Sequence, residues 1–253
     1  MVSPSDAALP RVIVYDIATA DGRVALSPGR LLMDDPRWPR YAEGGYATVW
    51  ARHAPDALLE GAGTFVPPAA APLEWPAGAT VEPGDYLPAD IVAAAPRWFA
   101  VTDSRGRVRW PFTELPLAQW AGTRLIVLVS KRTPAGYRAY LRSERIPYLV
   151  AGDDRVDLRA ALTTMRARLG VTTLVATCGG ELGGALLRAG LVDQVEIEVV
   201  PLVAGGRITP ALFSSAELGD DEPPTRLRLM DTTTYADGRV LLSYAVERAA
   251  TTE

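Results

Sequence analysis

Cysteine and histidine are almost absent from this sequence, which has one of each, Cys178 and His53, in 253 residues. A lone cysteine cannot form an intrachain disulfide, and no Cys/His cluster has the spacing of a zinc site, so we expect no metal and a reducing, cytoplasmic environment. A single histidine also leaves Ser-His or Cys-His catalysis with one possible base, which argues against a hydrolase.

The sequence also has no strong positive charge and no long apolar run. Its net charge is -4 and its pI is near 5.2, so it offers no basic field to nucleic acid or anionic lipid. No apolar stretch approaches the roughly 20 residues of a membrane span, and Met1–Pro10 lacks the pattern of a signal peptide. We therefore expect no nucleic-acid or membrane partner, a short flexible tail over 1–10 and a single domain over 11–249.

Short β-branched runs alternate with amphipathic segments, which predicts the α/β class with a mixed, mainly parallel sheet flanked by helices. After Pro201 the pattern changes to alternating polar and apolar residues around Asp237-Gly238, which predicts a C-terminal antiparallel pair over Arg226–Asp231 and Arg239–Glu247. The other predicted strands are Arg11–Ile17, Ala57–Glu60, Arg97–Thr102, Arg124–Ser130, Pro147–Ala151, Thr173–Cys178 and Gln194–Pro201.

Helix signals lie between these strands. Asp157 is a candidate N-cap before a stripe of apolar residues at helical spacing, and Gly170 supplies the stop. Further helices are predicted after Thr133-Pro134, over roughly Glu181–Ala189, and along the stripe that ends near Pro55. The many prolines between Phe65 and Pro96 predict an irregular excursion, which is a lid, an oligomer contact or neither.

Three strand ends carry the residues that suit a nucleotide. Thr177–Glu181 places two glycines and a helix N-terminus at a strand end, which suits a pyrophosphate, although tight packing also requires glycine. Ser130–Thr133 places two hydroxyls and two cations at another strand end, which suits the 2′-phosphate of NADPH, although a solvated charge pair is the alternative. Gly61–Thr64 offers a hydroxyl and close backbone approach.

These segments resemble, in order, the motifs of the riboflavin-biosynthesis pyrimidine reductase family. Ala18–Ala25 is similar to its "TLDG(R/K)IA" signature, and Gly61–Thr64 to its GxxT. Thr102–Arg105 is similar to its "LDSR", and Gly179–Gly206 to its Gly-Gly stretch and the following loop. The resemblance covers about Val12 to Phe213. It implies a dihydrofolate-reductase-like fold, NADPH as cofactor, hydride transfer to a C=N or C=O of a pyrimidine- or pterin-like heterocycle, and a homodimer.

The resemblance also implies roles for individual residues. Ala18 would lie by the nicotinamide, and Asp21 and Glu43 are the candidate proton donors, with a turn and a helix N-terminal charge as the respective alternatives. Tyr41, Tyr46 and Trp50 are candidates for an aromatic wall against the substrate, unless they are only core. The cofactor candidates are Gly61, Ala62, Thr64, Ser104, Ser130, Lys131, Arg132, Gly179, Gly180, Glu181 and Leu182.

The sequence departs from the family pattern at two places. Cys178 stands where the family carries a glutamate near the substrate, and the segment after Thr64 is Pro/Ala-rich where the family has an acidic, substrate-holding run. We therefore expect an altered substrate pocket that contains Cys178. The alternative is a catalytically altered NADPH-binding sensor or interaction protein.

Overall fold

The computed structural model describes residues 8–66, 70–116 and 120–247, and the predicted flexible tail falls mostly outside them. Contacts divide the chain into two compact units. Unit 1 comprises the described residues of Met1–Pro10 and Pro55–Leu174, and unit 2 those of Arg11–Ala54 and Val175–Glu253. The prediction of one domain over 11–249 stays a prediction.

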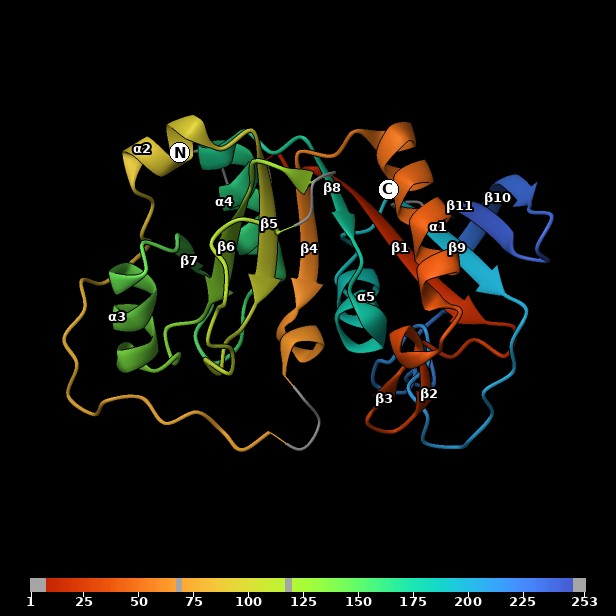
Figure 1. Cartoon of the computed structure of the whole chain (residues 1–253), viewed down its shortest axis with the longest axis horizontal. Coiled ribbons are helices and arrows are strands. Elements are labelled where there is room, and N and C mark those ends of the chain that lie inside the picture. The colour runs from red at the N-terminus through yellow and green to blue at the C-terminus, as the bar shows by residue number, and fades with distance from the viewer. Residues whose placement is uncertain (1–7, 67–69, 117–119, 248–253) are drawn as a thin grey trace. The chain divides into compact units, whose positions relative to one another are not determined.

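Unit 1 is built on four parallel strands in the order β4, β5, β6, β7 (Figure 1). Leu125–Val129 of the central strand β6 are almost completely buried, as expected of an apolar strand with neighbours on both sides. The elements of this unit are β4 (Ala57–Gly61), η2 (Ala62–Phe65), α2 (Ala89–Ala94), β5 (Arg97–Thr102), β6 (Thr123–Val129), α3 (Ala135–Ser143), β7 (Tyr148–Val150) and α4 (Leu158–Leu169).

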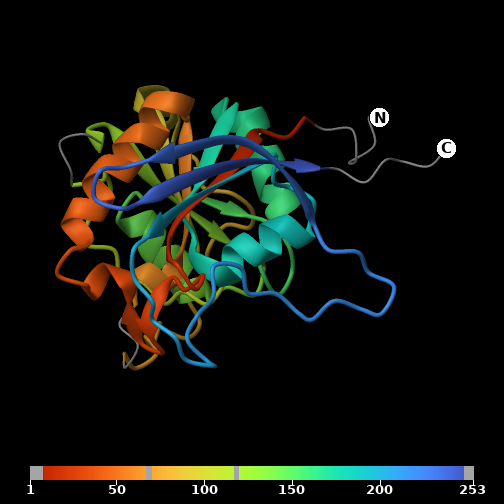
Figure 2. The ribbon, with the colours of Figure 1, turned by 90° about the vertical axis from the view of Figure 1, so that its right-hand side faces the viewer.

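Unit 2 has the strand order β10, β11, β9, β1, with β1 parallel to β9 and the other pairs antiparallel. Figure 2 shows β10 and β11 running side by side as a hairpin after a long connection without helix or strand. Its elements are β1 (Arg11–Thr19), β2 (Ala25–Ser27), β3 (Arg30–Leu31), η1 (Leu32–Asp34), α1 (Trp38–His53), α5 (Gly179–Arg188), β9 (Gln194–Val200), β10 (Arg226–Thr234) and β11 (Val240–Glu247). Strand β8 (Thr173–Ala176) begins in unit 1 and ends in unit 2.

The predicted α/β class, the parallel strands and the C-terminal antiparallel pair are confirmed. The caps of α4 are also as predicted, because Asp157 accepts a hydrogen bond from the Ala160 amide at 3.0 Å and Gly170 adopts the left-handed conformation. The Pro-rich excursion is less irregular than predicted. It contains α2, which fits between Pro88 and Pro96 because a proline just before a helix removes no hydrogen bond from it.

The excursion packs within unit 1 through aromatic side chains. The Trp75 ring stacks on Tyr140, with centroids 5.1 Å apart, and its Nε1 donates to the Gly106 carbonyl at 2.7 Å. Further along, Tyr86 pairs with Tyr148 as an isolated antiparallel bridge. Described parts of this segment are thus tied to α3 and β7.

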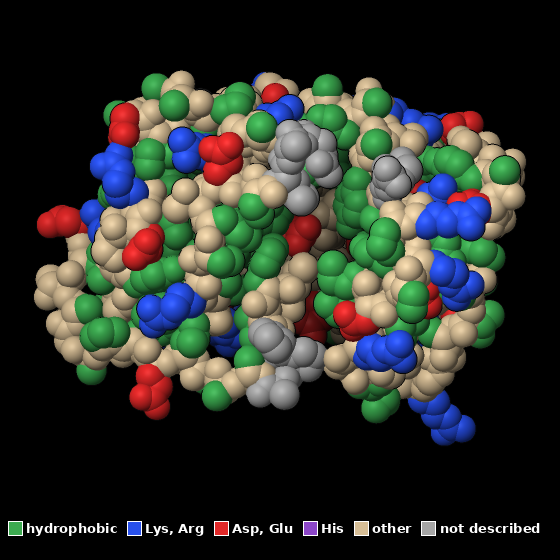
Figure 3. Space-filling view, viewed as in Figure 1, with side chains coloured by type: hydrophobic (Ala, Val, Ile, Leu, Met, Phe, Trp, Pro, Cys, Tyr) green, Lys and Arg blue, Asp and Glu red, His purple; other side chains and the backbone are tan. Residues whose placement is uncertain are grey.

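Across residues 8–66, 70–116 and 120–247, no helix is both long and apolar enough to cross a bilayer. On the face drawn in Figure 3, Lys and Arg side chains are interspersed with Asp and Glu side chains. The surface in that view therefore carries no single-sign charge field.

Candidate functional site

The N-terminus of α5 in unit 2 is the structure's best candidate for holding a pyrophosphate. Cys178 is its N-cap residue, and within the described chain its side chain makes no capping hydrogen bond to the first turn. Helix N-terminal amides carry partial positive charge and readily bind anions. The amide of Gly179 lies 3.4 Å from Oδ1 of Asp16, a carboxylate that the sequence analysis did not single out. The first turn of α5 therefore fits an anionic group.

The glycines of α5 also have a packing role. A Cβ on Gly180 would lie 2.2 Å from the Ala211 carbonyl oxygen, and one on Gly184 would lie 2.3 Å from that of Ser214. The Ser214 amide donates to the Gly180 carbonyl at 2.9 Å, which fixes this approach. Tight packing, the alternative given from the sequence, therefore explains why a glycine is needed at position 180. This packing brings the backbone of residues 211–214 against α5.

Asp21 follows β1 and is held as an ionised carboxylate. It accepts hydrogen bonds from Thr19 Oγ1 at 2.6 Å and from the amides of Ala204 and Gly205 at 3.1 and 2.8 Å. The Thr19 hydroxyl, followed by these amides, lowers the pKa of Asp21 to about 2. A carboxylate with this pKa carries no proton to give at neutral pH. The geometry therefore favours Asp21 as the anchor of the loop after Pro201.

The candidates from α1 are not gathered on one face. The alternative that Glu43 is a charge at the N-terminus of this helix is wrong, since α1 begins at Trp38; the Glu43 side chain lies outside the described residues. Tyr46 and Trp50 are four residues apart and share a helix face, but Tyr41 lacks that spacing. The Tyr46 ring packs edge-on against Tyr15, with centroids 5.5 Å apart.

In unit 1 the structure brings Ser104 and Ser130 together through Thr133. The Thr133 hydroxyl donates to the Ser104 carbonyl at 2.8 Å and accepts from the Ser130 amide at 3.0 Å. Ser104 Oγ accepts from the Val156 amide at 3.0 Å. The ends of β5, β6 and β7 are thus tied into one polar cluster, as expected where parallel strands end at one edge.

Lys131 and Arg132 extend from the same cluster into solvent. Lys131 Nζ lies 2.8 Å from Asp153 Oδ1, and Arg132 Nη1 lies 2.7 Å from Asp154 Oδ1. The pair raises the pKa of Lys131 and lowers that of Asp153 through their hydrogen bond and mutual attraction. Neither aspartate was predicted as a site residue, although both follow a predicted strand as Lys131 and Arg132 do.

Gly61, Ala62 and Thr64 lie at the end of β4, where the chain turns into η2. Ala62 is buried and Thr64 is exposed. The next residue, Phe65, packs its ring against Phe99 and Trp110 with centroids 5.8 and 5.2 Å away. Aromatic packing thus fixes this turn from its C-terminal side and leaves the Thr64 hydroxyl available to solvent.

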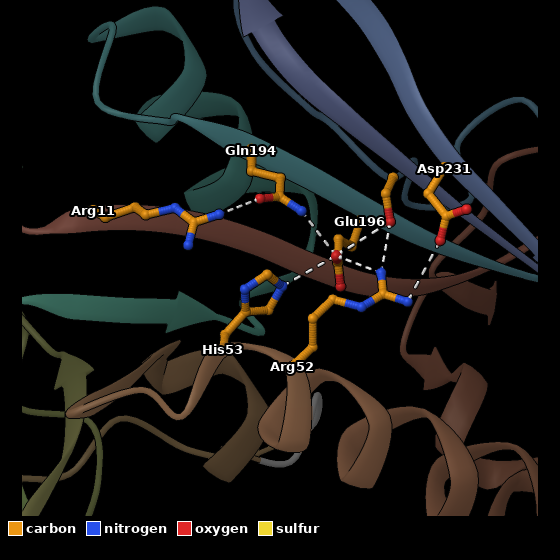
Figure 4. Close-up of polar contacts among 7 residues, drawn as sticks. Arg11, Arg52, His53, Gln194, Glu196 and Asp231 are labelled. Carbon is orange, nitrogen blue, oxygen red and sulfur yellow. Dashed lines mark hydrogen bonds and ion pairs between the residues drawn. The ribbon is translucent and has the colours of Figure 1, made fainter.

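Two glutamates on β9, Glu196 and Glu198, are buried and were not predicted as functional residues, and Glu196 lies at the centre of a charged cluster (Figure 4). Glu196 Oε1 lies 3.0 Å from Arg52 Nη1 and from His53 Nε2, and Gln194 Nε2 donates to it at 2.9 Å. Ser243 Oγ is a further contact, at 3.2 Å. The cluster ties the C-terminal end of α1 to β9 and β11.

The neighbouring Glu198 is held differently. It accepts a hydrogen bond from the Tyr15 hydroxyl at 2.9 Å and pairs with Arg239. Burial raises the pKa of Glu198 despite these contacts, whereas for Glu196 the hydrogen bonds from His53 and Arg52 outweigh burial and lower the pKa. Strand β9 therefore carries two buried carboxyl groups whose pKa values are shifted in opposite directions.

A known protein family matches almost the whole chain. The family model described as the RibD C-terminal domain matches residues 10–241. The chain belongs to this family. The resemblance inferred from the sequence motifs is thereby confirmed.

A curated relative and several solved structures extend this result. The 2,5-diamino-6-ribosylamino-4(3H)-pyrimidinone 5′-phosphate reductase of Methanothermobacter thermautotrophicus is 32% identical over 123 residues, which are 48% of this chain and 55% of that protein. The RibD structure from Acinetobacter baumannii aligns with 94% of this chain and 58% of its own, at 19% identity and a TM-score of 0.64. The riboflavin biosynthesis reductase Rib7 of Saccharomyces cerevisiae aligns with 94% of this chain and 90% of its own, at 16% identity and a TM-score of 0.58.

The chain therefore spans a little over half the length of the archaeal relative and of the Acinetobacter protein. At these identities the structural matches bear on the fold, and they confirm the predicted dihydrofolate-reductase-like architecture.

Proposed function

We propose that this protein is an NADPH-dependent reductase that transfers hydride to a C=N or C=O carbon of a pyrimidine-like heterocycle. The observation that carries the proposal is the family match over residues 10–241. The archaeal relative is named for a ribosylaminopyrimidine phosphate, which makes a compound of that class the first substrate to test. Cys178 and the Pro/Ala-rich segment after Thr64 support a substrate that differs from the family's standard one.

Each unit carries residues that the sequence motifs assign to NADPH. In unit 1, Lys131 and Arg132 offer two cations to the 2′-phosphate, whereas Ser130 is buried and its hydroxyl donates to the Asp154 carbonyl. In unit 2, the first turn of α5 offers backbone amides to the pyrophosphate. NADPH itself would supply the hydride, so the protein's task is to bind, orient and exclude water.

Two carboxylates of unit 2, Asp21 and Asp16, would position backbone segments and not take part in proton transfer. Asp21, held ionised by Thr19 and the amides of Ala204 and Gly205, would order the loop after Pro201 beside the end of β1. Asp16 accepts from the Gly179 amide and would help orient the first turn of α5. We assign neither residue a proton to donate.

The first prediction concerns nucleotide choice. We expect NADPH to bind more tightly than NADH, and a Lys131→Ala/Arg132→Ala double variant to weaken NADPH by about tenfold, or roughly 1.4 kcal/mol, with NADH changed less than about twofold. Titration of tryptophan fluorescence measures both affinities, and absorbance at 340 nm follows NADPH consumption with the pyrimidine phosphate. Failure of the wild-type protein to bind either nucleotide would contradict the proposed function.

We also propose that the protein is a homodimer that uses β10. This strand lies at the end of the strand order, and Leu227, Leu229 and Met230 on it are exposed by 38, 53 and 44%. A long exposed edge strand with apolar side chains is a template for pairing with another chain. A two-fold arrangement would let the same strand of both copies meet.

The second prediction tests this contact. Leu229→Lys should shift the protein toward monomer and weaken self-association by at least about tenfold, because a charge replaces an apolar contact. Sedimentation velocity over a concentration series measures the shift. Leu218→Lys, at another exposed leucine of unit 2, is the matched control and should leave association unchanged. Equal effects of both variants would exclude β10 as the contact.

A further inference from the structure

Four exposed charges at the ends of β6 and β7 form two matched pairs, here called the 131–154 charge cluster. It consists of Lys131 with Asp153 and Arg132 with Asp154, and all four side chains are between 72 and 82% exposed. The two cations are the ones assigned above to the 2′-phosphate of NADPH. Each therefore already has an anionic neighbour at salt-bridge distance.

Backbone hydrogen bonds fix the cluster in this register. The Lys131 amide donates to the Gly152 carbonyl at 3.0 Å, and the Arg132 amide donates to the Asp153 carbonyl at 2.9 Å. Ser130 Oγ donates to the Asp154 carbonyl at 3.2 Å. Because the main chain holds the two loops together, the carboxylates stay beside the cations whether or not the side-chain ion pairs form.

We propose that Asp153 and Asp154 are specificity-determining residues that limit the preference of this protein for NADPH over NADH. This inference rests on the proposed function. The two pairs sum to zero charge, and a phosphate monoester carries between one and two negative charges at neutral pH. A 2′-phosphate must therefore draw Lys131 and Arg132 away from two carboxylates that remain nearby, whereas the ribose hydroxyl of NADH meets no such repulsion.

The decisive variant neutralises both carboxylates without changing their shape. In Asp153→Asn/Asp154→Asn we expect NADPH to bind about tenfold more tightly and NADH to change by less than about twofold. Exposed ion pairs contribute little to folding, so the melting temperature should stay the same. Asp90→Asn is the matched control, because Asp90 is also an exposed carboxylate of unit 1 paired with an arginine, Arg145, at 2.5 Å.

Two further measurements report on the cluster itself. Salt should weaken NADPH binding to the double variant more steeply than to the wild-type protein, since the variant meets the phosphate with two uncompensated positive charges.

Lys131 is the only lysine in the sequence, so acylation of its amine can be followed by mass spectrometry without a nucleotide. Asp153→Asn should speed that reaction, because Asp153 raises the pKa of Lys131.

The possible outcomes separate the inference from the proposed function. If the wild-type protein binds NADPH but the double variant shows the same ratio of affinities, the inference is overturned and the proposed function stands. A loss of NADH binding without a gain for NADPH also overturns it, because the carboxylates would then bind the ribose hydroxyl. If neither nucleotide binds the wild-type protein, both fall.

Discussion

Replacing Glu196 with alanine is expected to lower the free energy of unfolding by about 3 kcal/mol. Removing one partner of a buried ion pair typically costs about 3–5 kcal/mol, because the remaining charge is left without compensation. The lower end applies here, since Arg52 is 31% exposed and keeps Asp231 at 3.7 Å. His53, whose side chain is only 3% exposed, would lose its contact at 3.0 Å (Figure 4). Urea unfolding followed by circular dichroism measures the loss.

Two variants control this experiment. Glu217→Ala removes an exposed glutamate of the same unit and should change stability by no more than about 0.5 kcal/mol. Glu196→Gln keeps the shape and an acceptor oxygen but removes the charge. Its loss of stability should therefore lie between those of Glu217→Ala and Glu196→Ala. A stability of Glu196→Ala equal to that of Glu217→Ala would show that the cluster contributes nothing to the fold.

The pKa shifts add a test by pH. The pKa of Glu196 is lowered from its ordinary 4.5, so its ionised form contributes stability that is present above pH 4.5 and lost as pH falls through the folded pKa. The pKa of Glu198 is raised, so its contribution has the opposite sign and is lost as pH rises through the folded value. The difference in stability between wild-type protein and Glu196→Gln should therefore shrink from pH 7 to pH 4, because Glu198 is common to both.

Local sequence patterns predicted most of the regular structure. The caps of α4 and the parallel strands of unit 1 follow from short-range rules, because a capping aspartate, a terminal glycine and continuous apolar runs each act within a few residues. The motif order likewise led to the correct family. The start of α1 at Trp38 was not predicted, because its N-cap residue, Arg37, makes no side-chain capping hydrogen bond and is not one of the residues that usually cap a helix.

The buried charges could not be predicted in the same way. In β9, Gln194–Val200 alternates polar and apolar residues, a pattern typical of a strand with one face in solvent, yet Glu196 and Glu198 are fully buried. The partner Arg52 lies 144 residues away in the chain, so nothing near the strand indicates it. Asp153 and Asp154 are the opposite case, because they follow a strand that had been predicted and their position beside Lys131 follows from the order of β6 and β7.

Gly180→Ala is expected to weaken binding of NADPH and NADH alike, by at least about tenfold each, and to lower the free energy of unfolding by about 1–3 kcal/mol. The added Cβ would lie 2.2 Å from the Ala211 carbonyl oxygen and 2.8 Å from Ser214 Oγ. The first of these is a backbone atom, so no side-chain rotation relieves it, and the first turn of α5 must move. The pyrophosphate is common to both nucleotides, so Gly180→Ala should weaken both affinities. Lys131→Ala/Arg132→Ala, in contrast, should weaken NADPH binding much more than NADH binding.

Gly183→Ala provides the matched control on the same helix. Its Cβ would lie 3.4 Å from the Phe213 ring, an ordinary contact, and alanine is favoured over glycine in a helix by up to about 1 kcal/mol. We therefore expect this variant to bind both nucleotides as the wild-type protein does and to be at least as stable. Isothermal titration of the two variants with NADPH and NADH tests the assignment. If Gly180→Ala loses stability but keeps both affinities, the close packing of α5 serves the fold alone, and the pyrophosphate must be sought elsewhere.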